Sequence, residues 1–234
     1  MALDLYCGAG LVADGLLAAG CAVVGVDLFP QPRFPGPFLQ HDALSLDPRF
    51  LDMFRFIWAS PPCLKDTVMK HAPGAKGDAH PDLIAPTRQV LQRWAARTGG
   101  KYVIENVETA PLLNPVTLCG SMFGLGVSDG GLRYHLERHR KFETNWPLAA
   151  PCACRHMKPV VGVYGGHARN RSKAHGGRST RDPWTRSHPE IMAEAMGVER
   201  LLTGAEISQG IPPAYARFIA EQLQRHLNEQ RIAA

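Results

Sequence analysis

Short apolar runs separated by longer amphipathic segments dominate the first half of the chain. Four runs are apolar at nearly every position and have the length of buried strands: residues 2–6, 22–26, 54–58 and 102–104. Between them, residues 11–19 repeat apolar side chains at helical spacing before Gly20, and residues 83–96 form a second helical segment. Strands that alternate with helices predict an α/β fold with a doubly wound, mostly parallel sheet.

The pattern changes after about residue 112. Short strand candidates at 116–119 and 160–164 are separated by glycine-rich loops, which is typical of a smaller, irregular lobe. Helical signals then return: Ser187 can cap a helix, Pro189 fits its first turn and Gly197 can end it. A closing helix is predicted over residues 213–228. The boundaries that follow are a core (1–145), a small basic region (146–186) and a helical closing segment (187–234).

Composition indicates a globular chain that does not enter a membrane. Its 234 residues are 45% hydrophobic, which is enough for an ordinary core. No apolar run approaches the roughly 18 residues of a membrane span, and the N-terminus lacks the basic region of a signal peptide. The six cysteines are scattered, which suits reduced thiols better than a disulfide framework. We therefore expect a cytoplasmic protein.

The net charge of +5 is concentrated in one segment. Residues 155–186 hold eight Lys and Arg against one acid, Asp182, so this segment carries +7 and the remainder sums to −2. A focused basic segment suggests a polyanionic partner. Arg169, Arg171, Lys173 and Arg178 are the candidates for contacts with DNA phosphates, and an ordinary solvated loop is the alternative interpretation.

A glycine turn follows the first predicted strand. Gly8 and Gly10 let the backbone approach a ligand closely, with N–H groups exposed before a helix. Asp27 ends the next strand, where a carboxylate can accept both ribose hydroxyls of a nucleoside, and Asp42 can take an adenine amino group. Because the turn lacks the complete Gly-x-Gly-x-x-Gly pattern, it favours S-adenosylmethionine over a dinucleotide. Glycines that serve only packing are the alternative.

A second constellation pairs a thiol with a carboxyl. Cys63 stands in "ASPPC" after the third predicted strand, and Glu105 ends the fourth. Prolines fix the direction of the preceding backbone, so the thiol would be presented at the edge where open α/β sheets bind ligands. A thiolate beside a proton donor is what attack on C6 of a pyrimidine requires. An ordinary core cysteine is the alternative.

The sequence resembles the DNA cytosine-5 methyltransferase family, in particular its short, phage-like members. "LDLYCGAG", "ASPPC", "YVIENV", "ERHRKF" and "ISQGIPPAYARFIAEQL" occur in the order and spacing of that family and cover most of residues 2–225. The resemblance implies an S-adenosylmethionine-dependent, Rossmann-like fold whose core carries catalysis and cofactor binding. It implies target recognition by the basic region, a base flipped out of DNA, and a monomer in the cytoplasm of a bacterial or phage-infected host.

The roles that the resemblance implies fall on eleven positions. Cys63 would be the nucleophile and Glu105 the partner of N3, while Arg138 and Arg140 match an Arg-x-Arg pair that holds O2 of the base and nearby groups. The cofactor would be bound by Tyr6, Gly8, Gly10, Asp27, Asp42, Gln209 and Gly210. Leu64 follows the nucleophile where the family commonly has Gln, a difference that concerns the gap left by the flipped base.

Two alternative functions stay open, and one group of residues resembles a metal site. The same fold could methylate RNA or a free pyrimidine nucleotide, or the chain could bind DNA without catalysis. Cys152, Cys154 and His156 resemble metal ligands. Because no second cysteine pair lies at zinc-site spacing, we expect no metal.

Overall fold

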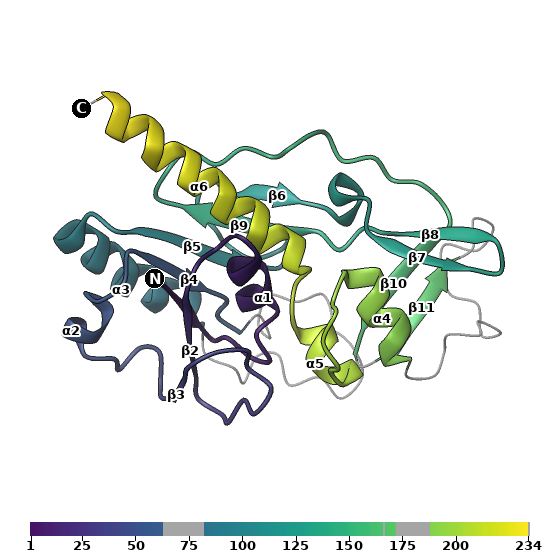
Figure 1. Cartoon of the computed structure of the whole chain (residues 1–234), viewed down its shortest axis with the longest axis horizontal. Helices are drawn as coiled ribbons and strands as arrows, with labels where there is room; N and C mark the ends of the chain where they lie inside the picture. Colours follow the sequence, from purple (N-terminus) through teal and green to yellow (C-terminus); the bar gives the residue numbers. More distant parts are fainter. Residues whose placement is uncertain (63–81, 166, 172–187, 234) are drawn as a thin grey trace.

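The computed structural model describes residues 1–62, 82–165, 167–171 and 188–233. Figure 1 shows a large sheet with helices on both faces and a second, smaller sheet beside it. Within the described residues, no helix is both long enough and apolar enough to cross a membrane.

The large sheet has seven strands in the order β3-β2-β1-β4-β5-β9-β6. The first five in this order run parallel, and β9 is antiparallel to both of its neighbours. Their bounds are β1 Ala2–Leu5, β2 Val23–Asp27, β3 Phe38–Gln40, β4 Phe56–Ala59, β5 Lys101–Asn106, β6 Val116–Leu118 and β9 Arg140–Thr144. The predicted fold class, a doubly wound and mostly parallel sheet, is confirmed.

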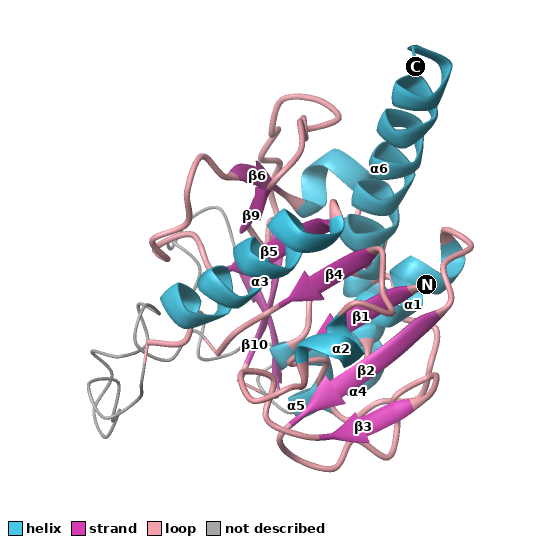
Figure 2. Ribbon diagram, turned by 90° about the vertical axis from the view of Figure 1, so that its left-hand side faces the viewer, coloured by secondary structure: helices cyan, strands magenta, loops and turns pink. Residues whose placement is uncertain are grey.

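Helices cover both faces of this sheet, which explains why its central strands are apolar throughout. β1 and β4 are buried at every position. Alternate residues of the strands pack against α1 (Leu11–Ala18) and α6 (Pro213–Ala233) on one face. The others pack against α2 (Pro48–Leu51) and α3 (Ile84–Thr98), which lie in front of the strands in Figure 2. A strand buried on both faces has no polar side, so its sequence does not alternate.

The second sheet has the order β11-β10-β8-β7 and packs on α4 and α5. The bounds are β7 Gly126–Asp129, β8 Leu132–Leu136, β10 Val160–Tyr164, β11 His167–Arg171, α4 Pro189–Met196 and α5 Gly204–Gln209, and a short 3-10 helix spans Gly120–Phe123. The strands predicted at 160–164 and 116–119 are thus present as β10 and β6. β7 and β8 come from the predicted core (1–145), whereas β10 and β11 come from the predicted basic region (146–186). The second sheet therefore combines strands from both predicted regions.

Helix ends follow the local signals in most places. Gly197 adopts a left-handed φ of 67° and ends α4, as its lack of a Cβ allows. His188 occupies the N-cap position of that helix, and Ser187, the predicted cap, lies outside the described residues. α6 continues to Ala233, beyond the predicted end at residue 228.

A buried ion pair connects α3 to β9 of the large sheet. Arg88 donates from Nε and Nη2 to the two carboxylate oxygens of Glu143 at 2.7 and 2.8 Å. The side chains of Arg88 and Glu143 are only 14% and 4% exposed. Arg88 also donates to the carbonyl of Pro111, and Glu143 accepts from the backbone N–H of Leu113 at 2.8 Å. The pair therefore fixes the loop that follows β5.

We expect Arg88→Ala to lower the free energy of unfolding by about 3–5 kcal/mol, because it leaves the Glu143 carboxylate buried without its cation. The double variant Arg88→Met with Glu143→Leu should recover most of that loss, since it removes both charges. Urea denaturation measures both. The control is Arg97→Ala, which breaks an exposed ion pair with Asp52 and should change stability little. Equal losses in the single and double variants would show that packing, not charge burial, is responsible.

Candidate active site

The carboxyl ends of four parallel strands meet at one edge of the large sheet. Leu5 of β1 pairs in register with Val26 of β2 and with Ala59 of β4, and Ala59 pairs with Ile104 of β5. The residues that follow each of these, Tyr6, Asp27, Ser60 and Glu105, therefore line the same edge. This is where open α/β sheets bind their ligands.

The turn after β1 is held against β2 and leaves space above Gly8. The backbone N–H of Gly8 donates to Oδ2 of Asp27 at 3.0 Å. A Cβ at Gly8 would meet no atom within 4 Å, and its φ of 50° favours glycine. Gly10 differs, because a Cβ there would lie 2.4 Å from Cδ of Pro35. Gly8 is thus open to a ligand, whereas Gly10 makes room for the segment that follows β2.

The predicted cofactor residues Tyr6, Asp27 and Asp42 surround this turn. The Tyr6 hydroxyl lies 2.8 Å from Oγ1 of Thr87, and burial raises its pKa, with a further contribution from nearby Asp42. Oδ1 of Asp27 accepts from the N–H of Phe29, and Oδ1 of exposed Asp42 accepts from that of Leu44, both at 3.0 Å. Each carboxylate is oriented by backbone donors and keeps further lone pairs for a ligand.

The electrostatics of this edge suit a cation. Asp4 is completely buried, and its two carboxylate oxygens have no hydrogen-bond partner among the described residues. Burial raises the pKa of Asp4 well above its usual value, and the carboxylates of Asp27 and Glu105 raise it further. A ligand that carries positive charge would relieve this repulsion.

Glu105 is a buried carboxyl with a cationic neighbour. It is the penultimate residue of β5, at 7% exposure, and Nε of Arg140 lies 3.2 Å from its Oε1. Burial raises the pKa of Glu105, and Arg140, Ser60 and Arg138 oppose that shift in part. The net effect favours the protonated carboxyl, the form that can donate to a base nitrogen.

Asn106 holds the segment that leads to Cys63. Its Nδ2 donates to the carbonyl of Pro61 at 2.9 Å, and its Oδ1 accepts from the N–H of Val107. Cys63 itself lies outside the described residues, but the chain is described up to Pro62. Asn106 therefore ties the proline pair to the strand end that carries Glu105. We assigned no role to this residue from the sequence, although it stands within the "ENV" motif.

The two arginines of the Arg-x-Arg pair make different contacts. Arg138 is buried and donates from Nη1 to the carbonyl of Val163 at 2.8 Å, and from Nη2 to the carbonyls of Ser208, at 2.7 Å, and Gly210. Its Nε is buried and has no acceptor among the described residues. Burial lowers the pKa of Arg138 to about 9, so the guanidinium is still protonated at neutral pH. Arg138 fastens the second sheet and the closing segment to the core, whereas Arg140 faces Glu105.

Gln209 and Gly210 bring the closing segment back to the glycine turn. Gln209 is exposed at the end of α5. A Cβ on Gly210 would lie 2.7 Å from Cδ2 of Leu11, the first residue of α1. The absence of a side chain at Gly210 therefore lets this loop pack directly beside the turn.

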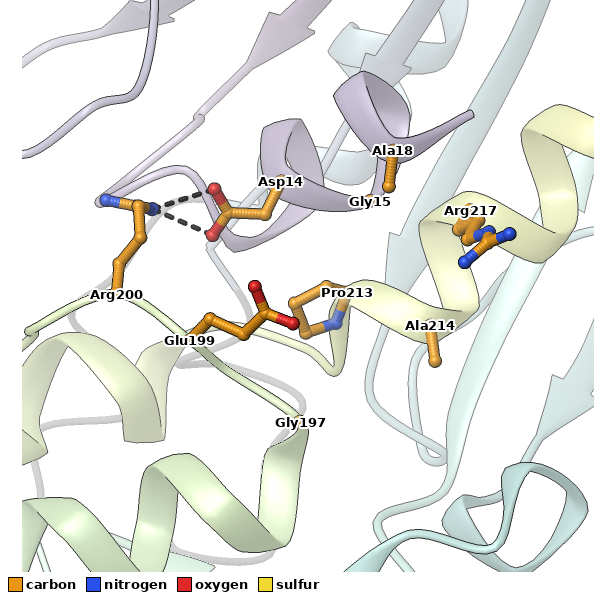
Figure 3. Close-up of a pocket in the computed structure, with 9 residues that line it drawn as sticks. All are labelled: Asp14, Gly15, Ala18, Gly197, Glu199, Arg200, Pro213, Ala214 and Arg217. Atoms are coloured by element: carbon orange, nitrogen blue, oxygen red, sulfur yellow. Dashed lines mark hydrogen bonds and ion pairs between the residues drawn. The ribbon is translucent and has the colours of Figure 1, made fainter. Parts of the chain in front are cut away.

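Arg200 is a positioning residue that sequence reasoning missed. It donates to Oδ1 and Oδ2 of Asp14 at 2.7 and 2.9 Å, and to the carbonyls of Ala9 and Arg33 at 2.7 and 2.6 Å. It thereby fixes the glycine turn, α1 and the segment after β2 together. Figure 3 shows the Arg200–Asp14 pair at the rim of a pocket of about 330 Å³ that extends toward Pro213 and Arg217. This pocket includes none of the residues predicted to bind cofactor or base.

Only part of the predicted DNA-binding set is described. Arg169 and Arg171 belong to β11, at the edge of the second sheet, and only their backbone is described. Lys173 and Arg178 lie outside the described residues. Their role in DNA binding stays a prediction.

We expect Asn106→Asp to lower the free energy of unfolding at pH 7 by about 1–3 kcal/mol, because it places an acceptor against the buried carbonyl of Pro61. The loss should shrink as the pH falls, since the protonated carboxyl can donate to that carbonyl again and its pKa is raised in the folded state. Denaturation at several pH values measures this. Asn228→Asp on the exposed face of α6 is the control. A loss that does not change with pH would contradict the assigned bond.

Comparisons with known proteins agree with this architecture. No family model matches the sequence, and no curated protein matches it. Several solved structures share its fold, among them three from E. coli, S. pombe and Spodoptera frugiperda. An E. coli prophage-encoded protein assigned as a DNA modification methyltransferase aligns over 97% of this chain and 99% of its own, with a TM-score of 0.63 and 12% identity. The Dnmt2 methyltransferase of S. pombe aligns over 97% and 99% with a TM-score of 0.58 and 13% identity. A Spodoptera frugiperda DNMT2 mutant aligns over 95% and 98% with a TM-score of 0.55 and 13% identity. The chain therefore has the Rossmann-like fold of these methyltransferases over nearly its whole length.

Proposed function

We propose that this protein transfers a methyl group from S-adenosylmethionine to C5 of cytosine in DNA, through a covalent adduct with Cys63. The observation that carries the proposal is the buried carboxyl of Glu105, contacted by Arg140 and joined through Asn106 to the segment before Cys63. The fold shared with methyltransferases supports the reaction type.

The chemistry requires a nucleophile and a proton donor on the two sides of one pyrimidine. C5 of cytosine is a poor nucleophile until a thiolate adds to C6, and that addition places electron density on the ring. Glu105 donates a proton to N3 and so stabilises the adduct. Arg140 offers a cation to O2 of the base, and Arg138 has one buried N–H free of protein acceptors within the described structure. After transfer, a general base removes the C5 proton, Cys63 leaves as the thiolate, and the N3 proton returns to Glu105.

The residues at the strand edge fit S-adenosylmethionine. Bound there, the cofactor would supply a methyl group on a positively charged sulfur. Gly8 leaves open space beside the turn, Asp27 would accept the ribose hydroxyls, and Asp42 the adenine amino group. The acidic side chains of Asp27 and Asp42, held at this edge by backbone donors, suit a cationic ligand. Tyr6 would stack near the nucleoside, Gly10 would support the turn, and Gln209 and Gly210 would close the site from the end of α5.

DNA is the substrate that the charge distribution favours. Residues 155–186 carry a net charge of +7. Within this segment, the side chains that would contact DNA phosphates are Arg169, Arg171, Lys173 and Arg178. A prophage-encoded DNA modification methyltransferase shares the fold, and so do two Dnmt2 methyltransferases. Methylation of RNA or of a free nucleotide, and DNA binding without catalysis, are the competing outcomes of the test below.

The test is methyl transfer from isotope-labelled S-adenosylmethionine to duplex DNA, RNA and dCMP of matched cytosine content. We expect label in DNA, recovered as 5-methylcytosine after digestion. Cys63→Ser should abolish transfer and leave cofactor affinity by calorimetry unchanged, since the thiol acts only in the covalent step.

Cys152→Ser is the matched control, because Cys152 is an exposed cysteine with no part in the proposed reaction, and it should retain full activity. Label in RNA alone would overturn the DNA assignment. Cofactor and DNA binding with no transfer to any substrate would favour a non-catalytic protein.

A further inference from the structure

Four potential metal ligands converge at one point outside the site described above. They are Cys119, His139, Cys154 and His156, and one ligand atom from each lies within 4.8 Å of the other three. Cys119 is buried, His139 is half-buried, and Cys154 and His156 are exposed. Two thiols and two imidazoles form the ligand set that zinc prefers in structural sites.

The spacing of the ligand atoms matches a tetrahedral ion. With Zn–S bonds of about 2.3 Å and Zn–N bonds of about 2.0 Å, neighbouring ligand atoms lie about 3.3–3.8 Å apart. Nε2 of His139 lies 3.4 Å from Sγ of Cys154 and 3.1 Å from Nε2 of His156. Sγ of Cys119 lies 3.7 Å from Nε2 of His156. The Cys154–His156 distance, 2.7 Å, is shorter, and a small rotation of either exposed side chain would lengthen it.

Groups around the cluster orient the ligands. Oε2 of Glu108 lies 3.9 Å from Nδ1 of His139, the ring nitrogen that does not face the cluster. This separation is longer than a hydrogen bond, so Glu108 would fix the ring and strengthen it as a ligand only after moving closer. The Ser121 hydroxyl donates to Sγ of Cys119 at 3.2 Å and accepts from the N–H of Arg155 at 3.2 Å.

We propose that Cys119, His139, Cys154 and His156 bind one structural zinc ion. The sequence offered only Cys152, Cys154 and His156 and no second cysteine pair at zinc-site spacing, so we expected no metal; Cys152 is not among the converging ligands. The remaining ligands come from the end of β6 and from the residue between Arg138 and Arg140. Residues 145–159 contain no helix or strand, and a metal is a physical means of fixing so long a connection.

The proposed ion would also act on the active site. His139 is the central residue of the Arg-x-Arg pair, and Nη1 of Arg140 donates to the carbonyl of His139 at 2.8 Å. Arg140 directly follows His139, and Glu105 lies three residues before Glu108. Each residue of the Arg140–Glu105 pair is therefore close in sequence to a residue at the cluster. Zinc would therefore hold Arg140 beside Glu105. This functional consequence rests on the proposed function, whereas the metal site itself does not.

The experiment is metal analysis of tag-free, reduced protein after equilibration with zinc and removal of the excess. We expect about one zinc per chain. Cys154→Ser and His156→Ala should each lose most of the bound metal, and both remove exposed side chains, so folding should survive. Cys152→Ser, two residues from Cys154, is the control and should keep the full stoichiometry. Replacement of zinc by Co²⁺ should give the absorption of a tetrahedral thiolate complex in the wild-type protein and the control only.

Three results would overturn the proposal. They are folded wild-type protein that holds no zinc, zinc that binds equally to the Cys154→Ser and His156→Ala variants, or a Cys119–Cys154 disulfide in the protein as isolated. Because each readout is metal content, absorbance or thiol mass, the outcome does not depend on methyl transfer. An inactive enzyme with one zinc in this site would separate the two proposals.

Discussion

The buried carboxyl of Glu105 is the constraint around which the candidate site is built. A carboxylate at the end of an internal strand is costly unless a cation compensates it or it keeps its proton. Arg140 supplies that cation at 3.2 Å because β9 runs antiparallel to β5 and brings its first residue alongside the end of β5. Although Arg140 lowers the pKa of Glu105 in part, burial has the larger effect and raises it. The same geometry gives an acid that can donate a proton and a cation that can face a base oxygen.

Three polar side chains hold this edge together by capturing backbone carbonyls from distant segments. Asn106 holds Pro61, Arg138 holds the end of β10 and the closing segment, and Arg200 holds the glycine turn. The captured carbonyls belong to loops, to the end of β10 and to the last turn of α5. The loops that carry the candidate residues are therefore fixed by contacts outside the regular elements. A zinc ion bound by Cys119 and His139 would in the same way fix the segment that precedes Arg140.

Local patterns were enough to predict the central strands, the fold class and the strand-end positions of Asp27 and Glu105. β7 and β8 were missed because "GVSD" and "LRYHL" mix charged and apolar side chains, as strands with an exposed face do. β9 was missed because "RKFET" carries Arg140 and Glu143, whose charges are paired by residues distant in the sequence. Arg200 and Asp14 are 186 residues apart, and nothing near Arg200 indicates its partners. Contacts between residues so far apart in the sequence, which include that of Cys119 with His156, have no local pattern from which they could be predicted.

The central claim is that Cys63 adds to cytosine beside Glu105, and a trapped adduct tests it most directly. In DNA with 5-fluorocytosine, the fluorine cannot leave C5 as a cation, so elimination of the thiol is blocked after methyl transfer. The account predicts a denaturation-resistant complex whose mass equals the chain plus the methylated oligonucleotide, with the link on Cys63 in the digested peptide. It predicts no complex with Cys63→Ser. A link to another residue, or no adduct when DNA and S-adenosylmethionine both bind, would contradict it.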